Sequence, residues 1–159
     1  MMCMAESGCY PVPVLFYIHG GAYAYGNPAN WPFDHWIHQS PNVIITSIYY
    51  RLDSFGFLAA PEMVSQGHGD ANVGFYDQIE ALKWVQEHIS AFGGDPSRIT
   101  MNGESAGASS VELHLVSQES TTMFSQAIIQ SVYRTPLPLL EQQEVSKHTE
   151  GRLHLGSSF

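Results

Sequence analysis

The chain has 159 residues, 44% hydrophobic and 13% charged, which is typical of one globular domain with a core and excludes a disordered chain. Its formal net charge of -9, from 15 acidic and 6 basic residues, disfavours nucleic acid and anionic membranes as partners. No apolar run reaches the length of a membrane span, and the first residues lack the basic and apolar segments of a signal peptide. Cys3 and Cys9 are too few to define a disulfide framework, so the cysteines do not indicate whether the protein resides in an oxidising or a reducing compartment.

Residues 13–18 are a short unbroken apolar run, which predicts a buried strand. A glycine-containing loop follows, His19-Gly20-Gly21-Ala22, and it extends to Gly26. This loop is similar to the H-G-G-G motif that supplies backbone N–H donors to an oxyanion hole. Glycines there let a ligand approach the backbone closely. Taken alone, a Gly-Gly pair is better explained by an ordinary turn after a strand.

The next segment, residues 27–41, contains prolines and aromatic residues and predicts a loop with a short helix. His35 and His38 are three positions apart, a spacing that suggests a metal, but no third ligand accompanies them. Solvated or half-buried histidines explain them better, so we expect no metal site. Residues 43–50 form another apolar run, and a strand buried on both faces favours a parallel sheet covered by helices.

Residues 51–58 lead into a loop through residues 67–72, and a long helix is predicted from about residue 73. One apolar stripe at helical spacing supports it: Ile79, Leu82, Val85, Ile89 and Phe92. Gly93-Gly94 ends the helix, and Pro96 follows soon after. With strand-like runs at 98–102 and 124–131, the alternation of strands and helices predicts a parallel α/β sheet.

The motif Gly103-Glu104-Ser105-Ala106-Gly107 has the form G-x-S-x-G, between the strand-like run 98–102 and a helical pattern at 108–116. Chance matches to five residues are common, but a strand that turns sharply into a helix is the context of a nucleophile elbow. We expect Ser105 to have φ > 0. The residues at 103 and 107 are glycines because a Cβ at either position would collide with the neighbouring strand or helix. The Ala106 amide would then lie at a helix N-terminus, where it favours an anion.

The glycine loop and the elbow together are far more specific than either motif alone. They occur in the expected order, with strands and a helix between them. A serine hydroxyl needs a base before it attacks a carbonyl, and it needs donors for the oxyanion that forms. The pair of motifs therefore predicts acyl transfer through Ser105.

Four stretches carry a resemblance to a known family: PVLFYIHGGAYAYG, YRLDSFGFL, DANVGFYDQIEALKWVQEHISAFGGDPSRIT and GESAGA. Between about residues 13 and 130 the chain resembles the type-B carboxylesterase/lipase family, the cholinesterase-like branch of the α/β-hydrolases. The resemblance implies hydrolysis of a small carboxylic ester through an acyl-enzyme on Ser105, without a cofactor. It also implies the following supporting residues: an oxyanion hole from the amides of Gly21, Ala22 and Ala106, Gly20 at the start of that loop, and Glu104 near the catalytic histidine. A structural, largely buried ion pair between Arg51 and Asp77 is implied as well.

Three features depart from the family pattern. The loop reads Gly-Gly-Ala where three glycines are usual, and Val132 stands where glycine is usual. The family places its acidic partner and its histidine far beyond the elbow, whereas this sequence ends at Phe159. We therefore expect a partial α/β-hydrolase domain over residues 1–132, incomplete at both ends, and a weakly structured tail over 133–159.

No histidine is predicted to act as the base. His114 is two and a half helical turns beyond Ser105 and points away from the elbow, and His148 and His154 lie in the tail. We expect the 159-residue chain alone to lack enzymatic turnover. Two alternatives to an esterase remain: a non-catalytic, cholinesterase-like interaction protein and an inactive truncated product. Ser105 in a complete elbow favours the enzyme.

Overall fold

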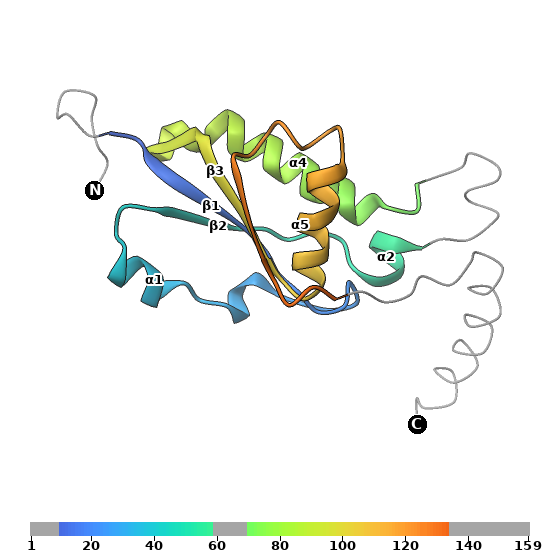
Figure 1. The fold of residues 1–159 in the computed structure, drawn as a ribbon. Coiled ribbons are helices and arrows are strands. Elements are labelled where there is room, and N and C mark those ends of the chain that lie inside the picture. Colours follow the sequence, from blue (N-terminus) through green and yellow to red (C-terminus); the bar gives the residue numbers. More distant parts are fainter. Residues whose placement is uncertain (1–9, 59–69, 134–159) are drawn as a thin grey trace.

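The computed structural model describes residues 10–58 and 70–133, which form a parallel sheet with helices on both faces (Figure 1). The strands are β1 (Val12–Ile18), β2 (Ile44–Ser47), β3 (Gly94–Glu104) and β4 (Gln126–Gln130). They lie in the order β2-β1-β3-β4, and neighbouring strands pair in parallel. The predicted parallel α/β sheet is confirmed, although β2 is shorter than the apolar run 43–50 and β3 begins earlier than residue 98.

The described helices are α1 (Asp34–Gln39), α2 (Asp53–Phe57), α4 (Val73–His88) and α5 (Ala106–Val116). Short 3-10 turns occur at η1 (Pro28–Asn30) and at η2 (Ile89–Phe92), which continues α4. The predicted long helix is thus confirmed as α4 with η2, and it ends at Gly93, whose φ of 85° is left-handed. The segment at residues 51–58, for which the sequence predicts no element, contains the short helix α2.

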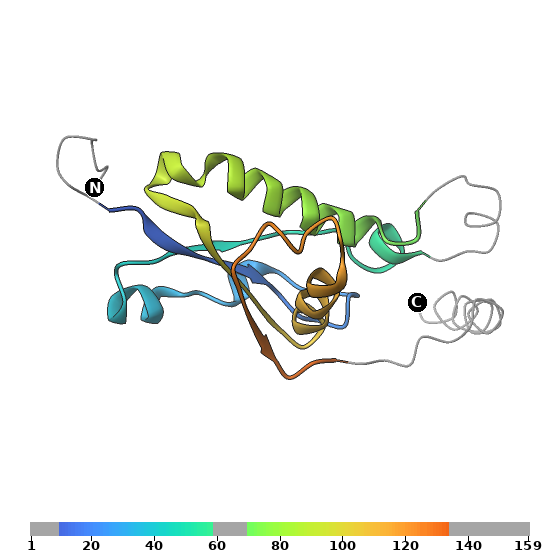
Figure 2. The ribbon, with the colours of Figure 1, turned by 45° about the horizontal axis from the view of Figure 1, so that its top comes forward.

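Helices α4 and α5 pack on one face of the sheet and α1 lies on the other, as Figure 2 shows for α4 and α1. Alternate residues of β1, among them Phe16 and Ile18, join one core with Leu82 of α4 and Val111 of α5. Tyr17 faces the opposite side, where its ring meets Phe33 at 4.9 Å, just before α1. Burial on both faces explains why the β1 sequence is apolar without interruption.

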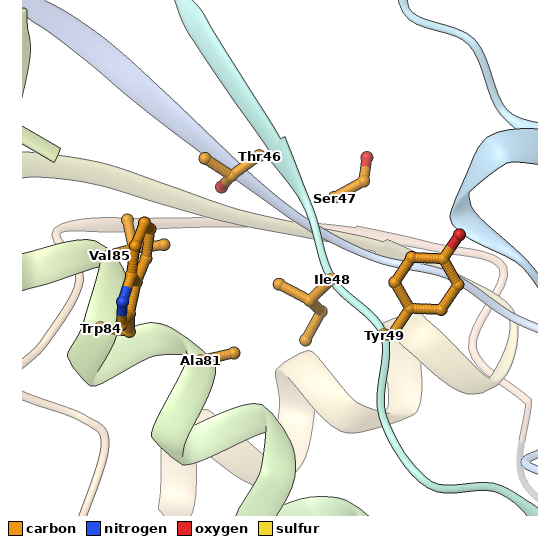
Figure 3. A pocket seen from close by; sticks show the side chains of 7 residues that line it. All are labelled: Thr46, Ser47, Ile48, Tyr49, Ala81, Trp84 and Val85. Carbon is orange, nitrogen blue, oxygen red and sulfur yellow. The ribbon is translucent and has the colours of Figure 1, made fainter. Parts of the chain in front are cut away.

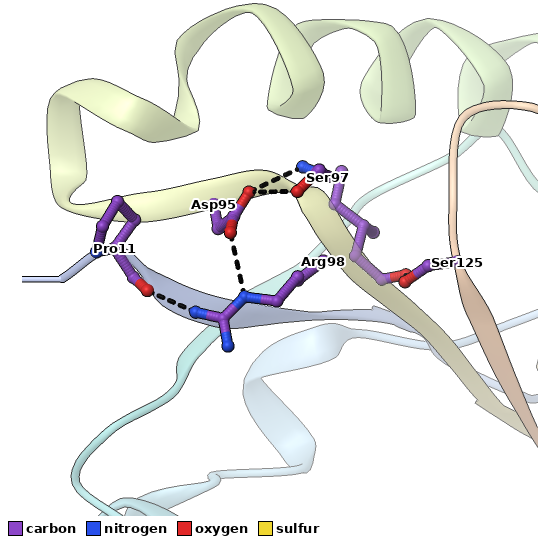
Figure 4. A network of polar contacts seen from close by, with 6 residues as sticks. Pro11, Asp95, Ser97, Arg98 and Ser125 are labelled. Atoms are coloured by element: carbon purple, nitrogen blue, oxygen red, sulfur yellow. Dashed lines mark hydrogen bonds and ion pairs between the residues drawn. The ribbon is translucent and has the colours of Figure 1, made fainter.

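A polar cluster lies beside a register shift at the start of β3 (Figure 4). The pairing of β1 with β3 moves from Val12 opposite Gly94 to Val14 opposite Ile99. Asp95 accepts hydrogen bonds from Ser97 N at 2.9 Å and from Arg98 Nε at 2.9 Å, and Arg98 also donates to the carbonyl of Pro11. The cluster ties the entry of β1 to β3, beside the pairing of Val12 with Gly94 that starts β3 before the predicted run.

The edge strand β2 borders an open pocket of about 420 Å³ against α4 (Figure 3). Its lining is Thr46, Ser47, Ile48, Tyr49, Ala81, Trp84 and Val85, and Trp84 is 51% exposed. No residue of the two sequence motifs lines it. The pocket is therefore separate from the predicted ester site.

Several predictions concern residues that the structure does not describe. From residue 134 onward the predicted tail lies outside the described residues, together with His148 and His154. Cys3, Cys9 and residues 59–69 lie outside them too. Within residues 10–58 and 70–133, no helix has the combination of length and apolar character that crossing a bilayer requires.

Candidate active site

Ser105 occupies the turn between β3 and α5, at the carboxyl end of a strand in the middle of the sheet. Its backbone has φ 56° and ψ −121°, outside the region that residues other than glycine prefer, and such a conformation costs about 1–3 kcal/mol. The residue is half-buried and directly precedes the first residue of α5. The turn thus has the strained geometry that the sequence predicts at this serine.

The two flanking glycines are required by close backbone contacts. A Cβ on Gly103 would lie 2.3 Å from the carbonyl carbon of Gly107, and one on Gly107 would lie 2.0 Å from the carbonyl oxygen of Ile18. Neither contact is possible for an alanine without movement of backbone. The first turn of α5 therefore packs directly on β3 and β1, which brings Ser105 to its place.

Backbone hydrogen bonds from the end of β4 also hold the turn. Ser105 N donates to Gln130 O at 3.0 Å, and Tyr133 N donates to Ser105 O at 3.3 Å. Ser109 N, one turn along α5, donates to the same carbonyl at 3.0 Å. The segment that contains Val132 is therefore hydrogen-bonded to the elbow, although Val132 stands where the family usually has glycine.

The loop 20–26 lies against the elbow. A Cβ on Gly20 would be 2.6 Å from Glu104 O and 3.0 Å from the Cβ of Ser105. Three successive residues then have positive φ: Gly21 at 114°, Ala22 at 54° and Tyr23 at 61°. The structure therefore brings the predicted loop and the predicted nucleophile together.

Three backbone N–H groups near the elbow donate no hydrogen bond to a backbone carbonyl in the turns, loops and helix caps of the described residues. They belong to Gly21, Ala22 and Ala106. Ala106 is the first residue of α5, where N–H groups have no partner inside the helix and the helix dipole is positive. The Gly21 carbonyl instead accepts from Ala24 N at 3.0 Å and Tyr25 N at 3.1 Å. Free amides beside a serine are the donors that an anion requires.

His19 holds the start of the loop. Its buried ring stacks on Tyr50 at 4.6 Å, its Nδ1 lies 2.8 Å from Gly20 O, and Tyr50 donates its hydroxyl to His19 O at 2.8 Å. Burial lowers the pKa of His19, while the hydrogen bond to Gly20 opposes that shift. A neutral ring with these contacts is a structural part of the loop.

Glu104 is half-buried and follows the buried Asn102 by two positions on β3. Burial raises the pKa of the nearby Tyr17, and the charge of Glu104 raises it further. Asn102 Oδ1 is buried and has no hydrogen-bond partner among the described residues. The sheet face beside the elbow therefore carries a carboxylate and an unsatisfied amide oxygen.

A chain of five polar side chains, not predicted from the sequence, connects the loop with both long helices; we call it the Tyr23 network: Tyr23, Ser110, Gln78, His114 and Ser120. Ser110 Oγ lies 3.3 Å from Tyr23 Oη and 3.1 Å from Gln78 Nε2. His114 joins its Nε2 to Gln78 Oε1 at 3.2 Å and its Nδ1 to Ser120 Oγ at 2.9 Å. One sequence signal was available, since Ser110 and His114 are four residues apart on the buried side of α5.

Arg51 and Asp77 form a two-pronged ion pair. Arg51 Nη2 lies 2.7 Å from Asp77 Oδ1 and Arg51 Nε lies 2.8 Å from Oδ2, which also accepts from Arg51 N at 2.9 Å. The expectation that the pair is largely buried is wrong, because the side chains are 55% and 26% exposed. The side-chain hydrogen bond from Arg51 holds the pKa of Asp77 below its usual range.

No histidine in residues 10–58 and 70–133 has a hydrogen bond to Ser105. His114 contacts Gln78 and Ser120, away from Ser105 as the sequence predicts. His35 and His38 are exposed on α1, and in this described part no three His, Cys, Asp or Glu side chains are grouped as ligands for a metal ion. The described site consists of a serine and amide donors.

Comparisons with known proteins agree with this geometry. The acetylcholinesterase of Danio rerio is 41% identical over 140 residues, which cover 86% of this chain and 21% of that protein. The acetylcholinesterase of Bungarus fasciatus is 42% identical over 120 residues, which cover 75% of this chain and 19% of that protein. The chain thus spans about a fifth of the length of these curated relatives.

A solved carboxylesterase of Geobacillus stearothermophilus has a similar structure, with a TM-score of 0.67 and 40% identity over 75% of this chain and 25% of that one. The predicted partial α/β-hydrolase fold is confirmed by this similarity. The family model described as the carboxylesterase family matches residues 5–150. The resemblance seen in the sequence is therefore confirmed, and the chain belongs to the carboxylesterase family.

Proposed function

We propose that this chain carries the nucleophile and the oxyanion hole of a serine hydrolase that cleaves small carboxylic esters. The observation that supports the proposal most is the contact between the loop 20–26 and the strained turn at Ser105. Oγ of Ser105 attacks the ester carbonyl and gives its proton to a base, and the acyl group is held on the serine until water releases it. The base comes from residues outside the described part, because no histidine within it contacts Ser105.

The amides of Gly21, Ala22 and Ala106 are proposed to bind the oxyanion. Negative charge develops on the carbonyl oxygen during attack, and fixed N–H donors stabilise it without reorganisation. Loss of a single donor in such a site costs about 2.7–4 kcal/mol of transition-state stabilisation. Glu104 is assigned a supporting role beside the nucleophile, where its carboxylate lies close to Gly20.

The test uses the complete protein as its own cells express it, treated with a fluorophosphonate that forms a bond to an activated serine. Peptide mapping is expected to find the label on Ser105. Ser105→Ala should lose both the label and the hydrolysis of an aryl ester, whereas Ser90→Ala, an exposed control on η2, should keep both. Hydrolysis that survives in Ser105→Ala would exclude the mechanism. A folded wild-type protein without label would favour the non-catalytic interaction protein.

The purified 159-residue chain tests where the base lies, because sustained turnover of the aryl ester is expected only if one of its own residues serves as the base. A site without its base retains about 10³–10⁴-fold over water at most, from the oxyanion hole and binding. Sustained turnover by the purified, monomeric chain would show that one of its own histidines serves as the base.

A further inference from the structure

The loop 20–26 adopts a conformation that its own residues do not favour. Ala22 and Tyr23 have φ of 54° and 61°, and Tyr23 is a bulky side chain in the left-handed region. Only the surrounding structure can maintain such a backbone. The contacts of Tyr23 therefore decide whether the amides before it stay beside Ser105.

Tyr23 is held from three sides. Its carbonyl oxygen accepts from Asp53 N at 2.7 Å, and its ring packs on Phe57 at 4.9 Å. Its hydroxyl lies 3.3 Å from Ser110 Oγ. The first two contacts lead to α2, whereas the hydroxyl contact leads to α5, the helix that begins at the nucleophile. The hydroxyl thus joins the loop to the element that carries Ser105.

The Tyr23 hydroxyl interacts with two hydroxyls of α5, those of Ser110 and Ser109, and the Ser110 hydroxyl has a defined orientation. Ser110 Oγ accepts a proton from Gln78 Nε2, so the serine O–H is left to donate to Tyr23. The carbonyl of Gln78 then faces His114, which must carry its proton on Nε2 and accept from Ser120 at Nδ1. Burial lowers the pKa of His114 to about 4, so its ring is neutral near neutral pH and has one proton to place.

We propose that Tyr23 is a positioning residue through which the Tyr23 network holds the loop 20–26 against Ser105. This inference rests on the proposed function for its consequence, because a displaced loop removes amides from the oxyanion hole. The network itself is defined by contacts that hold whether or not Ser105 reacts. Four of its five members are fully buried, so a broken link leaves a buried polar group without a partner.

Amide hydrogen exchange in the complete protein tests the network without relying on catalysis. Tyr23→Phe removes the hydroxyl and keeps the ring, and we expect the amides of Ala24 and Tyr25 to exchange at least tenfold faster. Tyr25→Phe is the matched control on the same loop, 70% exposed and without a side-chain hydrogen bond in the described part, and it should stay within twofold of wild type. Unchanged exchange in β3 shows that the fold is intact. Loop exchange within twofold of wild type in Tyr23→Phe would overturn the proposal.

A double-variant comparison distinguishes the network from an isolated hydroxyl contact. In a Gln78→Met background, Tyr23→Phe should add less than a twofold acceleration, because the serine is no longer oriented. A second tenfold acceleration would show that Tyr23 acts without the network. Ser110→Ala removes the same link and replaces Gln78→Met if that variant does not fold.

The phosphonylation rate of Ser105 connects the loop to the site. Tyr23→Phe should lower it at least threefold, and an unchanged rate despite faster loop exchange would overturn the positioning role. If wild-type Ser105 takes no label, the proposed function fails, and the exchange results still decide whether the network holds the loop.

Discussion

Acidification is expected to destabilise the protein through His114. The side chain is fully buried, contacts Gln78 and Ser120, and stacks on Phe75 at 4.4 Å. Burial lowers its pKa from 6.5 to about 4. Between these values the unfolded chain binds more protons than the folded one, so stability is complete above about pH 6.5 and is lost as pH falls toward 4. At 1.36 kcal/mol per unit of pKa, the loss is about 2 kcal/mol at pH 5 and about 3 kcal/mol below pH 4.

Urea unfolding followed by tryptophan fluorescence at a series of pH values measures this loss. His114→Gln lacks the titrating ring and retains hydrogen-bonding groups, so its stability should change about 2 kcal/mol less between pH 7 and pH 5. His19 is also buried with a lowered pKa, but it is present in both proteins and cancels in the comparison. Equal pH dependence of the two proteins would refute the assignment to His114.

Four further outcomes are expected from unfolding measurements. Ser105→Gly should abolish hydrolysis yet raise stability by about 1 kcal/mol, because relief of about 1–3 kcal/mol of backbone strain exceeds the entropy cost of glycine. Gly107→Ala should cost about 3 kcal/mol from the 2.0 Å clash, against about 1–2 kcal/mol for Gly93→Ala, which has positive φ but open space around it. Asp77→Asn should lower the melting temperature at neutral pH, and its difference from wild type should vanish as pH falls below 3.8 through the lowered pKa. Asn102→Leu should raise stability by about 1–3 kcal/mol, because it removes the buried, unpaired oxygen.

Burial on both faces made the sheet readable in the sequence. The strand β1 and the helix α4 carry apolar patterns that a buried strand and an amphipathic helix impose, so they were predicted within a few residues. The helix α2 has only five residues, with Gly56 inside it, and it has no period to detect. The early start of β3 reflects the pairing of Gly94 with Val12 across a register shift, which an apolar pattern does not reveal.

The candidate site likewise has a part that the sequence predicts and a part that it does not. The elbow and the glycine loop are local motifs whose glycines are dictated by close contacts, such as that of Gly107 with Ile18. The Tyr23 network depends on side chains from separate helices, and neither Gln78 nor Ser110 has a signature of its own. The burial expected for Arg51 was wrong. The family resemblance identifies Arg51 and Asp77 as a pair, but it does not specify how many neighbouring side chains cover them.

The position of Ser105 is determined by three neighbouring strands of the sheet as well as by the elbow itself. The loop 20–26 follows the carboxyl end of β1, the elbow follows that of β3, and residues 131–133 follow that of β4. Because the three strands are parallel neighbours, these segments meet at one edge, where open α/β sheets place their ligands. The strained serine is fixed there by Gln130 on one side and by the packing of Gly20 on the other. A change in either neighbouring strand therefore reaches Ser105 without any substitution in the elbow.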